Sequence, residues 1–81
     1  MKRGKMIKEL DTVVLVHDVL ENGLVQGDVG AVVHLYSDGA TYEVEFVTAE
    51  GRTVAVLTLT NQDVRLMRPH EILHARELQA A

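Results

Sequence analysis

The stretch that decides the fold is Thr41–Val47, which reads Thr-Tyr-Glu-Val-Glu-Phe-Val. Its apolar side chains, Tyr42, Val44 and Phe46, alternate with polar ones. A period of two residues is typical of a β-strand that has one buried face and one face in solvent. The stretch therefore predicts a strand that covers an apolar core on one side only.

Turn signals bound this strand at both ends. Asp38-Gly39 precedes it and Glu50-Gly51 follows it, and glycine supplies the positive φ that a tight hairpin turn needs. Runs rich in β-branched residues lie beyond these turns, and the polar turn Asn61–Asp63 separates the last two runs. The runs predict four more strands, over residues 12–17, 30–36, 52–60 and 64–67.

Five short strands joined mainly by hairpins predict an antiparallel small barrel of the SH3-like type, because closure hides the strand edges that promote aggregation. We expect a mostly β chain with three parts: a flexible basic arm (1–8), the barrel (9–68) and a short tail (69–81). The predicted core consists of Val14, Val16, Val29, Val33, Leu35, Tyr42, Val44, Phe46, Val56, Leu57, Leu59 and Leu66.

The composition restricts the class of protein. The chain has 81 residues, enough for one domain, and it contains no cysteine for disulfides or thiolate metal sites. No apolar run approaches the ~18 residues that a membrane span needs. We therefore expect a cytoplasmic protein without membrane contact. The formal net charge of −4 disfavours nucleic acid as a ligand, because phosphate recognition needs a basic face.

The tail contains the segment His70–His74, which matches the zinc motif H-E-x-x-H. Pro69 and Glu71 favour a helix, on which the two histidines could share a zinc ion. An alternating strand is the alternative, and it would hold the two histidines too far apart for one ion. No third ligand follows at a metalloprotease-like spacing. We interpret the segment as part of the surface, and we expect no metal and no cofactor.

The remaining chain offers binding residues rather than catalytic ones. It has neither a nucleophile elbow nor a phosphate-binding loop, so we expect no enzymatic activity. The candidate partner-binding residues are an aromatic-polar pair on one strand face, two arginines suited to an anion, and three apolar tail residues. They are His34 and Tyr36, Arg65 and Arg68, and Ile72, Leu73 and Leu78.

Four segments, Glu9–Leu15, Gly27–Tyr36, Tyr42–Val47 and Thr58–Thr60, carry a family resemblance. In this order they resemble a family of small bacterial proteins, common in cyanobacteria, catalogued as a domain of unknown function. The resemblance implies an SH3-type barrel similar to that of the nitrile hydratase β subunit and to the KOW modules of ribosomal and transcription proteins. It also implies an antitoxin-like or accessory role beside a neighbouring gene, and it assigns no catalytic residue.

We therefore expect a non-catalytic module that binds another protein, encoded by a neighbouring gene, with a homodimer as a variant of this interpretation. The alternative is a KOW-type nucleic-acid module that uses the basic arm together with Arg65 and Arg68. A zinc hydrolase that uses His70, Glu71 and His74 is the remote alternative.

Overall fold

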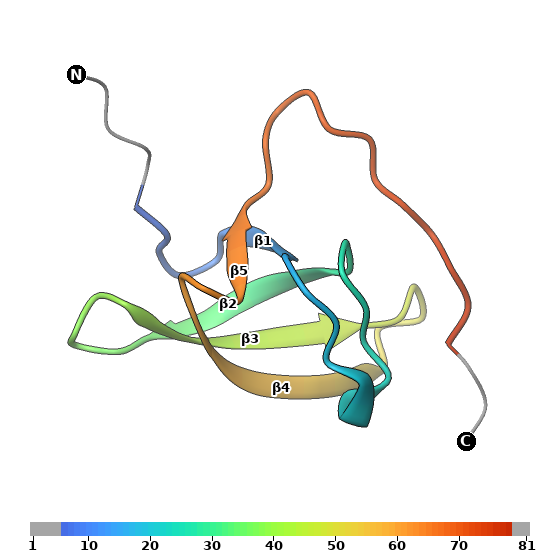
Figure 1. The fold of residues 1–81 in the computed structure, drawn as a ribbon, viewed down its shortest axis with the longest axis horizontal. Helices are drawn as coiled ribbons and strands as arrows, with labels where there is room; N and C mark the ends of the chain where they lie inside the picture. The colour runs from blue at the N-terminus through green and yellow to red at the C-terminus, as the bar shows by residue number, and fades with distance from the viewer. Residues whose placement is uncertain (1–5, 79–81) are drawn as a thin grey trace.

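The computed structural model describes residues 6–78, so most of the predicted basic arm and the last residues of the tail, 79–81, lie outside the described residues. The described chain forms one antiparallel sheet with the strand order β4-β3-β2-β1-β5 (Figure 1). The elements are β1 (Thr12–Leu15), the 3-10 turn η1 (Leu20–Asn22), β2 (Val29–Leu35), β3 (Thr41–Val47), β4 (Thr53–Thr60) and β5 (Val64–Leu66). The predicted mostly β fold with five antiparallel strands is confirmed.

The hairpin turns form where the sequence places glycine after an acidic residue. In the β2–β3 turn the Asp38 carboxylate accepts hydrogen bonds from the backbone N–H groups of Ala40 and Thr41, at 2.9 and 3.0 Å. Gly39 follows with a φ of 71°, and Gly51 in the β3–β4 turn has a φ of 87°. Residues other than glycine rarely adopt such positive φ angles, so glycine at these two positions sets the geometry of the hairpins.

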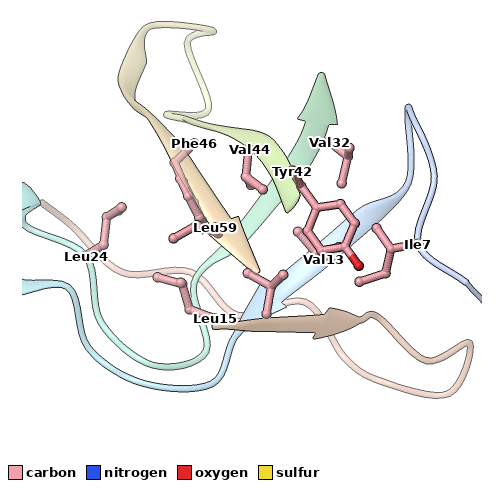
Figure 2. Close-up of a cluster of buried hydrophobic side chains, with 10 residues drawn as sticks. Ile7, Val13, Leu15, Leu24, Val32, Tyr42, Val44, Phe46 and Leu59 are labelled. Atoms are coloured by element: carbon pink, nitrogen blue, oxygen red, sulfur yellow. The ribbon is translucent and has the colours of Figure 1, made fainter. Parts of the chain in front are cut away.

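The core is one apolar cluster on the inner face of the sheet (Figure 2). Tyr42, Val44 and Phe46 of β3 lie at its centre, as the alternation in Thr41–Val47 predicts. Leu59 of β4 and Val64 of β5 belong to the same cluster although their strands form opposite edges of the sheet. The sheet therefore curves around a single core.

Gly30 of β2 allows a close approach between β2 and β3. A Cβ atom at this position would lie 2.7 Å from Cγ1 of Val44 and 2.9 Å from Cε2 of Phe46. Real Cβ atoms do not approach other carbons so closely, so β2 can pack on these side chains only with glycine here.

The core prediction is wrong for Val16, Val33 and Val56, which are exposed. The buried neighbours of Val16 and Val33 are Leu15 and Val32. Val14 and Val29 are not exposed, but they lie outside the cluster. The apolar run of four residues from Val13 to Val16 allows two phases of alternation, and Val13 and Leu15 of β1 face the cluster. In β2 the register with β3 shifts between Val32 and His34, so a bulge turns Val33 outward and brings Leu35 back to the core.

The sequence favours a helix for the tail, and in the described chain residues 70–78 adopt neither helix nor strand. Isolated helices shorter than ~12 residues are marginal unless an apolar face packs on the body. Here Ile72 and Leu73 are exposed, so the apolar side chains of the tail contribute no such packing.

Among residues 6–78 the structure has no helix long and apolar enough to cross a membrane.

Candidate docking surface

The C-terminal tail leaves β5 and arcs around the outside of the sheet to the opposite end of the molecule (Figure 1). Over residues 69–78 its only backbone–backbone hydrogen bond joins the N–H of Glu71 to the carbonyl of Arg68, at 3.2 Å. Two arginine–carboxylate pairs, rather than regular secondary structure, hold it to the body.

The first pair joins the tail to β5. The Nη1 and Nη2 atoms of Arg65 donate to the two carboxylate oxygens of Glu71, at 2.9 and 2.6 Å. The backbone N–H of Arg68 donates to the same carboxylate, at 2.6 Å. The bidentate hydrogen bonds from Arg65, with help from Arg68, lower the pKa of Glu71 to about 2. Glu71 therefore stays ionised, and paired, at any physiological pH.

The second pair joins the tail to the loop before β2. The Nε and Nη2 atoms of Arg76 donate to the two oxygens of Asp28, at 2.9 and 2.5 Å, and Nη2 also donates to the carbonyl of Gly23 at 2.9 Å. Asp28 is held in place because it accepts the backbone N–H of Val25 at 2.9 Å. Partial burial opposes its ionisation, but Arg76 and this N–H outweigh burial, so the pKa of Asp28 lies below its ordinary value.

The segment between the two pairs presents apolar side chains to solvent. Ile72 is 92% exposed and Leu73 is 70% exposed, whereas the charged residues at the two attachment points are partly covered. A hollow lies between the tail and the sheet, lined on the body side by Leu24, Phe46 and Val54, among others, and on the tail side by residues 73–78. Leu78 is half-exposed at its rim.

The two predicted arginines differ in their surroundings. The guanidinium of Arg65 is engaged by Glu71 within the chain, and the pairing raises the pKa of Arg65 above its ordinary value. Arg68 is exposed beside Pro69, and both line a second hollow together with Tyr42 and Asn61. Arg68 is therefore the arginine of the two whose side chain faces solvent.

The predicted pair His34 and Tyr36 lies on the outer face of the sheet. The two rings meet edge to face, with centroids 4.7 Å apart and an interplanar angle of 89°. The Tyr36 hydroxyl donates to Glu43 on β3 at 2.7 Å, and Thr58 of β4 donates to the same carboxylate. The Thr58 and Tyr36 hydroxyls together lower the pKa of Glu43 below its ordinary value, so Glu43 holds the Tyr36 side chain in place on this face.

The candidate residues thus form two groups. One lies along β5 and the tail and contains Arg65, Arg68, Ile72, Leu73 and Leu78, and the other is the pair His34 and Tyr36. Within residues 6–78 no hydrogen bond or ion pair joins the two groups.

Asp28 and Arg76 were not among the residues predicted to act in binding. They are separated by 48 positions, and no local pattern links them.

The zinc motif does not form a site in the described part of the chain. Its helical interpretation needs His70 and His74 on one helix face, and the segment is not helical. Glu71, its expected general base, is bound to Arg65. Among residues 6–78 no three His, Asp or Glu side chains converge as metal ligands.

Comparison with known proteins identifies a family without an assigned activity. A family model described as "Domain of unknown function (DUF4926)" matches residues 9–66, so it spans β1 to β5 and stops before the tail. The chain matches no curated protein and no solved structure.

Proposed function

The chain belongs to the DUF4926 family, whose function is unknown, and we propose that it is a non-catalytic docking module whose C-terminal tail contacts a partner protein. One observation carries this proposal: two bidentate ion pairs hold the tail against the body while the side chains between them, Ile72 and Leu73, remain exposed. The partner is a protein with an apolar pocket that accepts these two side chains.

The energetics favour docking over a merely solvated tail. Burying a side chain such as Ile or Leu stabilises a complex by roughly 1.5–3 kcal/mol relative to leaving it exposed. An ordered segment also avoids part of the entropy that a flexible peptide loses on binding. The pairs Arg65–Glu71 and Arg76–Asp28 hold the tail in place before the partner arrives.

Two further elements belong to the proposal. The first is the SH3-like barrel, which the single curved antiparallel sheet and the core shared by both edge strands support. The second is the biological context, in which the chain is an antitoxin-like or accessory subunit of a larger protein encoded nearby. The family match stops at residue 66, which is consistent with a common body and a tail that differs with the partner.

The test is co-purification with an N-terminal tag, which leaves the tail free, from the native cell lysate in the presence of nuclease. We compare the wild type with Leu73→Asp and with the control Leu20→Asp, because Leu20 on η1 is 69% exposed and Leu73 is 70% exposed. We expect one protein in near-stoichiometric amount with the wild type and the control, and its loss with Leu73→Asp.

Two other outcomes of the co-purification would contradict the proposal. Recovery that is equal for all three proteins would show that the tail is not the contact. Recovery of RNA without nuclease, and of no protein with it, would favour a nucleic-acid module instead.

A further inference from the structure

The two edges of the sheet differ in how they are protected against pairing with another strand. The edge strand β5 has three residues, of which Arg65 is charged, and Pro69 follows closely. The other edge strand, β4, has eight residues, Thr-Val-Ala-Val-Leu-Thr-Leu-Thr, with neither a charge nor a proline. Proteins usually blunt a long edge with charges, proline or a covering segment, because its free backbone groups pair with other strands.

The backbone of β4 directs alternate residues toward this open edge. Thr60 shows the direction, since its N–H donates to the Asp63 side chain and its carbonyl accepts from the Asp63 N–H, both at 2.9 Å. Its partner on β3, Thr41, turns its carbonyl the other way, to the N–H of Tyr36 on the β2 side. Backbone groups alternate along a strand, so those of Thr58 and Val56 also point away from β3.

We propose that two copies of this chain pair antiparallel through β4, about a twofold axis at Leu57. This arrangement places Val56 opposite Thr58 of the second copy, and Thr58 opposite Val56. Each of these two pairs exchanges both backbone hydrogen bonds, while Leu57 faces its own copy in a non-hydrogen-bonded pair. The result is a continuous sheet of ten strands, twice the five of one chain.

The side chains along β4 are complementary to a second copy. On the outer face Val56, which is half-exposed, meets a threonine, and on the inner face the partly buried Leu57 meets a leucine. The nearest acidic residues are Glu43 and Glu45 on β3, beside Thr58 and Val56. Between copies they are separated by three strand spacings, roughly 14 Å, which exceeds the Debye length of about 8 Å at physiological salt. Repulsion across the pair is therefore weak.

The first experiment measures the mass of the full chain by sedimentation equilibrium, from micromolar to millimolar concentration. We expect a reversible dimer, with twice the 9.0 kDa mass of the chain. The Val56→Lys variant places a charge at the edge and should raise the dissociation constant about tenfold or more. The control Val33→Lys should leave it unchanged, because Val33 is similarly exposed but lies on the interior strand β2.

The second experiment uses the absence of cysteine in the chain. Non-hydrogen-bonded cross-strand pairs bring Cα atoms to about 4.5 Å, which lies within the range of about 4.4–6.8 Å that a disulfide needs. Under mild oxidation Leu57→Cys should therefore give a covalent dimer, and Val33→Cys should give far less. A monomer at all concentrations, equal cross-linking of the two cysteine variants, or a dimer that Val56→Lys leaves intact would each overturn the proposal. Val54 of β4 lines the hollow beneath the tail, but the pairing is centred on Leu57 and does not use Leu73, so Leu73→Asp should not affect the dimer.

Discussion

The sheet and the tail of this molecule are held by different forces. The sheet is held by a cluster of apolar side chains that includes Val13, Val32 and Val44, none of which has exposed surface. The tail is held by two arginine–carboxylate pairs, and its apolar residues Ile72 and Leu73 are largely exposed. Apolar burial is insensitive to moderate salt and pH, whereas ion pairs respond to both. The tail can therefore detach while the sheet stays folded.

The largest effect is expected from a cavity in the sheet. Phe46 is 2% exposed at the centre of the cluster, and Phe46→Ala should destabilise the protein by about 3–5 kcal/mol. Urea unfolding followed by circular dichroism measures this as a lower midpoint. The exposed neighbour Val47 is the control, and Val47→Ala should move the midpoint little. An equal loss of stability in both variants would contradict the claim that Phe46, and not Val47, lies in the core.

A smaller effect on the sheet is expected from one added methyl group. Gly30→Ala would place a Cβ atom 2.7 Å from the Val44 side chain and 3.0 Å from the Glu45 carbonyl. Such overpacking should cost about 1–3 kcal/mol in the same unfolding measurement. The neighbouring exposed residue supplies the control, Ala31→Val, with little expected change. If Gly30→Ala were neutral, the close packing of β2 on β3 would be wrong.

Removing one attachment of the tail should release the tail while the sheet stays folded. Arg76→Ala breaks the pair with Asp28, and the global stability should fall by about 1 kcal/mol or less. The tail, however, should become a better protease substrate, so Glu-specific cleavage after Glu71 and Glu77 should accelerate. The control is Arg52→Ala, because Arg52 is exposed and forms no ion pair within residues 6–78. Equal cleavage rates in the two variants would show that Arg76 does not hold the tail.

Acid should produce the same separation without a mutation. The folded pKa of Glu71, about 2, lies below the ordinary value of 4.5, and that of Asp28 is also lowered. Because these pKa values are lowered, the ion pairs hold the tail fully at any pH above the ordinary pKa of the carboxyl groups. This stabilisation is lost as the pH falls toward 2. Cleavage by pepsin should therefore begin in the tail as the pH falls through this window. Initial cleavage within the strands would contradict the expectation.

The smallest effect is expected at an ion pair within the body. The His17 ring donates a hydrogen bond from Nδ1 to the Asp18 carbonyl at 3.0 Å, and its Nε2 pairs with Asp63 at 2.7 Å. These two contacts raise the pKa of His17 above 6.5. The ion pair therefore contributes fully to the folding stability below pH 6.5, and this contribution is lost as the pH rises through the pKa of His17 in the folded protein. NMR titration of the His17 ring should show a lower pKa in Asp63→Asn. An unchanged titration would exclude the contact with Asp63.

The sequence predicted the sheet better than the tail, for a physical reason. Alternation within Thr41–Val47 reports which face of a strand is buried, and that face is the one observed. Alternation fails where both phases are apolar, as in β1, and where a bulge changes the phase, as at Val33. These are local exceptions, and they left the five strands and their antiparallel pairing intact.

The tail could not be predicted because its attachments are specific side-chain pairs, one of them between residues 48 positions apart. Its Ala, Leu, Glu and Arg residues favour a helix by local propensity, but propensity is a weak prior that tertiary contacts override. Here Glu71 pairs with Arg65 and Arg76 pairs with Asp28, 48 positions away. The exposed residues Ile72 and Leu73 were identified from sequence as apolar tail residues, whereas the pairs that present them required the structure.

The most direct test of this account is the backbone mobility of the tail, measured by ¹⁵N relaxation on the free full-length protein at neutral pH. The account predicts order parameters over residues 71–76 close to those of the strands, near about 0.85. It also predicts their fall in Arg76→Ala while the strand values stay unchanged. Order parameters below about 0.6 over the wild-type tail would contradict the claim that two ion pairs hold it in place.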